Sequence, residues 1–123
     1  SSMKCTRIYA GPHGESHFDE QTVALVAKDF APPTPLLNVS APIPAAQFVF
    51  ITLPPGWYGQ RHLAPRRQYW VQIAGQMDVE VGDGEVRRFN PGDVVLLDDV
   101  TGKGHVTRAV GQDEVRGIFV QLP

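Results

Sequence analysis

The chain has little cysteine and no long apolar run, and both absences restrict what it can be. Cys5 is the one cysteine among 123 residues, which excludes an internal disulfide and a cysteine-based zinc site. No stretch of about 18 apolar residues occurs, and the N-terminus lacks the charged and then apolar pattern of a secretory signal. We therefore expect a cytoplasmic protein that does not act in a membrane.

A strong charge of one sign is also lacking. The formal net charge is −2, and the 11 Lys and Arg residues are scattered along the chain. A protein that follows a phosphate backbone needs a basic stripe, so nucleic acid is not an expected partner. A small-molecule ligand or a second protein fits this composition better.

Turn residues and short apolar runs are abundant. A chain of 123 residues builds one core, and its 12 glycines and 11 prolines favour a single domain rich in turns. Turn signals recur at intervals of about ten residues, which is typical of an all-β sandwich or barrel. The β-prone segments from Gln47 onward are 47–53, 67–75, 76–82, 84–89, 92–99, 105–110 and 114–122.

Two kinds of strand pattern occur among these segments. Met77, Val79 and Val81 alternate with polar residues, which predicts a half-buried hairpin strand with these three side chains inward. Residues 48–51 and 94–97 are instead apolar at consecutive positions, so both of their faces should be covered. Either the preceding arm or a second subunit could cover them, and we expect a homodimer.

The first 46 residues differ from the rest. Residues 4–11 form a β-prone run, whereas residues 31–46 contain five prolines and cannot form a regular helix or a central strand. We expect 1–46 to be an N-terminal strand and an extended proline-rich arm packing on the barrel of residues 47–123, within a single domain overall.

One wall of that barrel carries a spaced set of glycine, histidine and glutamine. The set consists of Gly56, His62, Ala64, Gln68 and Gly75. Its spacing resembles, without a gap, the first motif of the cupin superfamily, G-x5-H-x-H-x3-E-x6-G. A second cupin motif, G-x5-P-x-G-x2-H-x3-N, is matched more loosely by Gly92, Asp98, Gly102, His105 and Ala109, with two extra residues.

The resemblance covers residues 47–110 and implies a fold. Cupins are double-stranded β-helix (jelly-roll) barrels, so the chain resembles a small single-domain cupin with an extended proline-rich N-terminal arm. In metal-binding cupins the motif histidines and glutamate hold a divalent ion such as Fe, Mn, Ni, Zn or Cu. His62 and His105 keep two of these positions, whereas Ala64 replaces a histidine and Gln68 replaces the glutamate.

The degenerate motif leaves the metal open. A site of His62, Gln68 and His105 would leave the charge of the ion uncompensated and bind it weakly. The alternative is a metal-free barrel in which neutral histidines accept protons themselves.

Strand alternation extends the list of inward side chains. If His62 and Gln68 face the interior, then Arg66, Trp70 and Gln72 share their parity. Gln72 and Arg66 are candidate ligand-binding groups, and Trp70 is core filler or cavity wall. Pro65 can interrupt the register at Arg66.

Residues near the second motif have two interpretations. Asp98 and Asp99 either cap the loop and pair with Arg66, Arg67 or Lys103, or Asp99 orients His105 as a base. Thr107 shares the parity of His105 and either orients it or simply suits a strand.

Two functional hypotheses follow. In the first, the chain is a cupin-type isomerase, lyase or cyclase, with His62 and His105 as catalytic groups and Gln68, Gln72, Trp70 and Arg66 binding a small organic molecule. In the second it is a non-catalytic barrel that binds or senses a small molecule. A metal-dependent dioxygenase is a further option. The amides and imidazoles expected inside the barrel favour a working pocket.

Overall fold

The computed structural model describes all residues 1–123 and is built from β-strands alone. It contains no helix, and therefore none long and apolar enough to cross a membrane. The strands are β1 (Ser2–Ala10), β2 (Ser16–Ala24), β3 (Val26–Lys28), β4 (Leu37–Val39), β5 (Gln47–Leu53), β6 (Tyr58–His62), β7 (Gln68–Ala74), β8 (Gln76–Glu80), β9 (Val86–Phe89), β10 (Val94–Asp98), β11 (His105–Val110) and β12 (Val115–Gln121).

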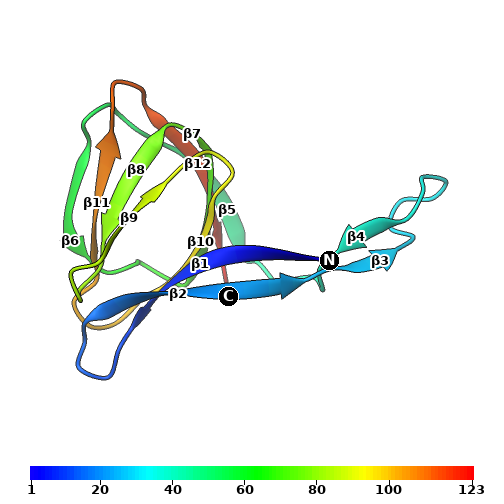
Figure 1. The fold of residues 1–123 in the computed structure, drawn as a ribbon, viewed down its shortest axis with the longest axis horizontal. Coiled ribbons are helices and arrows are strands. Elements are labelled where there is room, and N and C mark those ends of the chain that lie inside the picture. Colours follow the sequence, from blue (N-terminus) through cyan, green and yellow to red (C-terminus); the bar gives the residue numbers. More distant parts are fainter.

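Two sheets enclose the interior (Figure 1). The larger has six strands in the order β2-β1-β10-β7-β12-β5, and the smaller has four in the order β6-β11-β8-β9. Almost all neighbours are antiparallel, whereas β1 and β10 pair in parallel. This confirms the all-β jelly-roll prediction.

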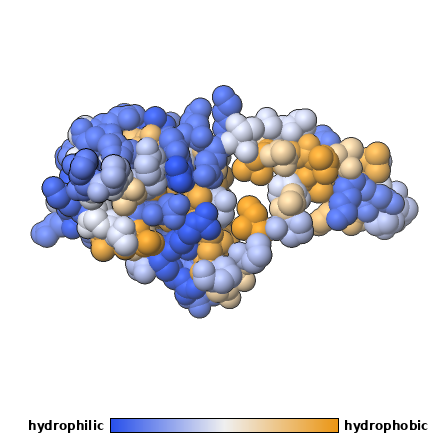
Figure 2. Space-filling view, turned by 90° about the horizontal axis from the view of Figure 1, so that it is seen from below, coloured by the Kyte–Doolittle hydropathy of each residue, from blue (hydrophilic) through white to orange (hydrophobic).

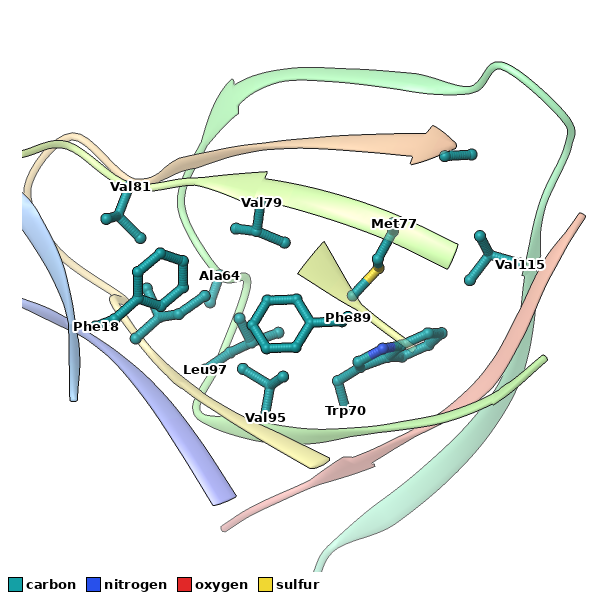
Figure 3. Packing of buried hydrophobic residues seen from close by; sticks show 12 residues of the cluster. Phe18, Ala64, Trp70, Met77, Val79, Val81, Phe89, Val95, Leu97 and Val115 are labelled. Carbon is teal, nitrogen blue, oxygen red and sulfur yellow. The ribbon is translucent and has the colours of Figure 1, made fainter. Parts of the chain in front are cut away.

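Alternation along the strands builds the core. Met77, Val79 and Val81 are 6%, 3% and 0% exposed, which confirms their inward direction. Figure 3 shows these side chains facing Trp70 and Val95 of the opposite sheet. The two sheets therefore pack on each other through one apolar cluster, which also forms the floor of a cavity.

The N-terminal strand belongs to the large sheet. Residues Thr6 to Tyr9 of β1 pair with Val95 to Asp98 of β10, and Ile8 is fully buried. β1 and β2 therefore extend the wall of the barrel, so residues before 47 contribute to the same core.

The hairpin of the proline-rich arm does not lie over its own barrel, contrary to our expectation, whereas Ile43 after it lines a hollow on the outer face of the large sheet beside Val71. β3 and β4 pair only with each other, and the hairpin projects away from the body (Figure 1). Phe30 and Leu36 on this arm are 63% and 65% exposed. Figure 2 shows apolar side chains along the arm in contact with solvent. Because prolines lack the amide donor, strand pairing within the arm is confined to the proline-free segments β3 and β4.

The two consecutive apolar runs differ in their surroundings. In β10, Val95 and Leu97 face the core while Leu96 is buried on the opposite face at 1% exposure, as predicted. In β5, Phe48 and Phe50 remain 60% and 76% exposed on the outer face of the large sheet. A single copy of the chain leaves these two rings uncovered.

Candidate functional site

A cavity of about 500 Å³ lies between the two sheets. Thirteen of its 19 lining residues are hydrophobic, and none is Lys, Arg, Asp or Glu. Its polar side chains are His62, Gln68, His105, Thr107 and Gln121. Such a cavity suits a molecule that is largely apolar and carries few polar groups.

His105 is the buried polar centre of this cavity. It begins β11 and is 4% exposed, and its Nδ1–H donates to Oδ2 of Asp99 at 2.5 Å. This hydrogen bond leaves Nε2 as the free ring nitrogen, able to accept a proton. Asp99 is fully buried, and its second oxygen, Oδ1, has no hydrogen-bond partner. Of the two interpretations of Asp99, the structure therefore shows the pairing with His105.

His62 lies beside His105 but is exposed. The two ring centroids are 4.7 Å apart, and the residues are paired across β6 and β11. His62 Nδ1 donates to the backbone carbonyl of Gln60 at 2.6 Å, which again leaves Nε2 free. The structure thus brings the two predicted histidines together, one buried and one accessible from solvent.

The loop before His105 is held by contacts that the sequence motifs do not include. Gly104 has a φ of +79°, and a Cβ there would lie 1.9 Å from the carbonyl oxygen of His62. Ser16, which is fully buried, donates its hydroxyl to the Gly104 carbonyl at 2.7 Å and accepts from the Gly82 amide. Only glycine allows the backbones of the two histidine segments to approach this closely.

Gln68 lies in the cavity wall at 2% exposure, as the alternation predicts. Its Oε1 accepts a hydrogen bond from Nε2 of Gln121 at 2.9 Å. We did not single out Gln121 from the sequence, although it has the same inward parity as Phe119 in β12 and this pattern could have identified it.

Gln72 is buried as expected, but it does not line this cavity with the other predicted site residues. Its Nε2 donates to the carbonyls of Gly75 and Phe89, each at 2.8 Å, and its Oε1 accepts from the Trp70 indole at 3.2 Å. These bonds satisfy the amide within the protein. Gln72 therefore ties strands together at the end of the barrel away from His105.

Arg66 is also excluded from the cavity. Its Nη2 donates to the backbone carbonyl of Leu122 at 2.6 Å. Strand β7 begins only at Gln68, so strand alternation does not extend back through Pro65 to this residue. Trp70 has both expected roles, because it packs in the core and lines the cavity, with its ring centroid 4.9 Å from that of Phe119.

Asp98 and Thr107 have modest roles. Asp98 accepts a hydrogen bond from Arg67 at 3.1 Å and lies 3.8 Å from Arg7, which matches the simpler interpretation of a surface carboxylate. Thr107 lines the cavity, but no hydrogen bond joins it to His105.

The residues at the cupin metal position do not fit a firmly held divalent ion. No three His, Cys, Asp or Glu side chains are placed together so that they could hold a metal. The oxygen of Gln68 already accepts a bond from Gln121, and Ala64 is buried at the place of a histidine ligand. Two imidazoles remain, which is fewer than the three or four protein ligands of a stable transition-metal site.

Comparisons with known proteins support the fold. No protein-family model matches the chain, and no curated protein matches it. Among solved structures, an RmlC-like cupin from Methanocaldococcus jannaschii with a double-stranded β-helix fold is 19% identical, with a TM-score of 0.55 over 87% of each chain. A cupin 2 conserved barrel domain protein from Salinispora arenicola is 23% identical, with a TM-score of 0.51 over 80% of this chain and 76% of its own.

A third similar structure comes from a yeast. The cupin domain of Cnp3 from Schizosaccharomyces pombe is 11% identical, with a TM-score of 0.50 over 98% of this chain and 83% of its own. These likenesses agree with the motif spacing of residues 56–75 and with the jelly-roll topology. The chain has the fold of the RmlC-like cupins, a small single-domain double-stranded β-helix barrel.

Proposed function

We propose that this protein binds a small, mostly apolar organic molecule in its barrel and moves a proton on it, as an isomerase, lyase or cyclase. The observation that carries the proposal is the buried pair of His105 and Asp99 in the wall of an otherwise apolar cavity. A histidine with one nitrogen fixed by a carboxylate and the other free is the usual form of a general base.

The proposed step needs no group beyond the protein. Nε2 of His105 takes a proton from a carbon next to a carbonyl group, and the electrons of the broken C–H bond pass into the carbonyl to give an enolate. In a β,γ-unsaturated ketone, returning the proton to the γ-carbon of the dienolate moves the double bond and isomerises the molecule. In a ketone with a leaving group on the β-carbon, the enolate electrons instead form a carbon–carbon double bond, and the leaving group departs with its bonding electrons. Asp99 stabilises the imidazolium formed between these steps.

The cost of burying Asp99 supports catalysis over simple binding. A buried carboxylate with an unpaired oxygen destabilises a fold by about 1 to 3 kcal/mol or more. A barrel that only stores an apolar molecule would gain stability from an uncharged residue at position 99. The non-catalytic alternative remains the second candidate, because the apolar cavity alone would serve it.

Deuterium exchange tests the proposal directly. The protein is incubated in deuterium oxide with a panel of small aryl ketones, and loss of the proton signal next to the carbonyl is followed by NMR. We expect exchange above the buffer rate, abolished in His105→Ala. Binding of the ketones without any exchange would favour the non-catalytic barrel.

We also propose that the protein is a homodimer in the cytoplasm. The exposed Phe48 and Phe50 on the outer sheet face, and the exposed apolar side chains of the arm, support a second copy as the missing cover. Cell fractionation would test the location.

A further inference from the structure

Three glutamines form a chain of hydrogen bonds from the surface to the cavity. Nε2 of Gln47 on β5 donates to Oε1 of Gln121 on β12 at 2.5 Å. Nε2 of Gln121 then donates to Oε1 of Gln68 on β7 at 2.9 Å. The three amides therefore point the same way across adjacent strands, and the oxygens of Gln121 and Gln68 each accept from the preceding glutamine.

This direction determines what Gln68 offers to a ligand. Its oxygen already accepts one hydrogen bond from Gln121, whereas its Nε2 makes no hydrogen bond within the protein although the residue lines the cavity. Asp99 Oδ1 is the one enclosed side-chain polar atom without a partner, so Gln68 Nε2 is reached from the cavity, where water or an acceptor on a ligand can take its hydrogen bond. An amide nitrogen cannot ligate a cation, so this orientation opposes a metal role for Gln68.

The rest of the lining restricts the class of the acceptor. Neither Lys nor Arg lines the cavity, so a carboxylate or phosphate would find no permanently charged partner there. Trp70 and Phe119 form an aromatic wall, with ring centroids 4.9 Å apart, that favours a flat ring. A neutral molecule with a ring and a carbonyl oxygen satisfies both conditions.

We propose that Gln68, held by Gln121, donates a hydrogen bond to the carbonyl oxygen of a neutral, ring-bearing ligand. Its position thus selects ketones over hydrocarbons of the same shape and over anions. The inference deepens the proposed function and rests on it in one respect: if His105 removes a proton, the same amide stabilises the enolate oxygen that forms. The binding preference itself does not depend on any reaction.

A comparison of matched probes tests the preference without turnover. Acetophenone, ethylbenzene and benzoate are titrated separately into the full chain, and their dissociation constants are measured by protein NMR. The ketone preference is the dissociation constant of ethylbenzene divided by that of acetophenone. It is compared between the parent, Gln68→Leu and Gln121→Leu. Gln76→Leu is the control, because Gln76 is an exposed amide that bonds Asn90 outside the cavity.

We expect removal of the amide to lower the ketone preference by about five- to tenfold in Gln68→Leu, the equivalent of one hydrogen bond. Gln121→Leu should lower it less, and Gln76→Leu should leave it unchanged. Benzoate should bind most weakly to the parent. An unchanged preference in Gln68→Leu, or tightest binding of benzoate, would overturn the proposal.

Gln68→Glu provides a second test if the leucine variant does not fold. It keeps the shape and polarity of the side chain but replaces the donor by acceptors, so we expect the ketone preference to disappear. Stoichiometric binding of Mn²⁺ or Zn²⁺ to the parent that is lost in Gln68→Leu would also overturn the donor role. Retained ketone preference without deuterium exchange would count against the proton transfer alone.

Discussion

The Nδ1 nitrogen of His105 lies 2.5 Å from Oδ2 of Asp99, and both side chains are buried although they are separated by a loop of five residues, 100–104. The carboxylate accepts the Nδ1 proton and so fixes both the ring orientation and the tautomer. The free Nε2 belongs to a residue that lines the cavity. A base held in this way needs no reorganisation before it accepts a proton.

Asp99→Asn should separate the role of this carboxylate in proton transfer from its role in folding. The amide can still bond to the ring but cannot stabilise the imidazolium, so we expect ketone deuterium exchange to slow by about 100-fold or more. Thermal unfolding should change little or improve, because a buried charge with an unpaired oxygen is removed. Exchange kinetics and a melting curve on the same sample measure both effects.

The neighbouring residue is the control for that variant. Asp98→Asn makes the same chemical change one position earlier, where the carboxylate pairs with Arg67 at the surface. It should leave the exchange rate unchanged. An equal slowing in both variants would show that Asp99 does not act through His105.

Local spacing identified much of the site. Gln68, Trp70 and His105 are placed by motif spacing and strand alternation, and all three line the cavity. Alternation also placed Gln72 inward, which is correct, but it cannot tell how deep in the barrel a residue lies. Gln72 and Gln68 face the same interior, yet only Gln68 reaches the ligand space.

Contacts between distant segments could not be predicted from the sequence. Ser16 supports Gly104 across 88 residues, and Gln121 bonds Gln68 across 53. Such pairs depend on strand order in the folded sheets, which no local pattern specifies. The projecting arm escaped prediction for the same reason, because five prolines indicate an extended chain but not its direction.

Gly104→Ala should disturb the histidine pair through backbone contact. A methyl group there would overlap the carbonyl of His62. Gly111 has a similar φ of +84° but open space around it, so Gly111→Ala isolates the backbone strain, about 1 to 2 kcal/mol. In urea unfolding, we expect Gly104→Ala to lower the free energy of unfolding by a further 1 to 3 kcal/mol, roughly, beyond the loss in Gly111→Ala. We also expect it to abolish deuterium exchange of the ketone. Equal losses in the two variants would contradict this contact.

The thiol of Cys5 should be unreactive in the folded protein. Burial, and to a lesser degree the charge of Asp19, raises the pKa of Cys5 above its ordinary value. Less reactive thiolate is therefore present at a given pH, and the side chain is only 6% exposed. A disulfide reagent at mildly alkaline pH should modify the native chain far more slowly than the urea-unfolded chain. Equal rates would show that the N-terminal strand opens readily.

The pKa of Cys5 also predicts how stability varies with pH. The pKa of Cys5 is higher in the folded state than in the unfolded state. The protonated thiol therefore contributes fully to the free energy of unfolding below the unfolded-state pKa, and this contribution is lost as pH rises through the folded-state pKa. Cys5→Ala should therefore flatten the decline of the free energy of unfolding at alkaline pH. Burial also raises the pKa of Tyr69, so a smaller slope of the same sign should remain.

The outer face of the large sheet should decide the oligomeric state. Phe50 is 76% exposed there, with its ring 5.5 Å from that of Phe48. Phe50→Glu places a charge in the proposed dimer contact, so we expect a change from dimer to monomer by light scattering, with the barrel still folded. Val86→Glu is the control, because Val86 is 52% exposed on β9 in the other sheet. A parent that is monomeric at high concentration would exclude the dimer. A dimer that both variants retain would place the contact on another surface.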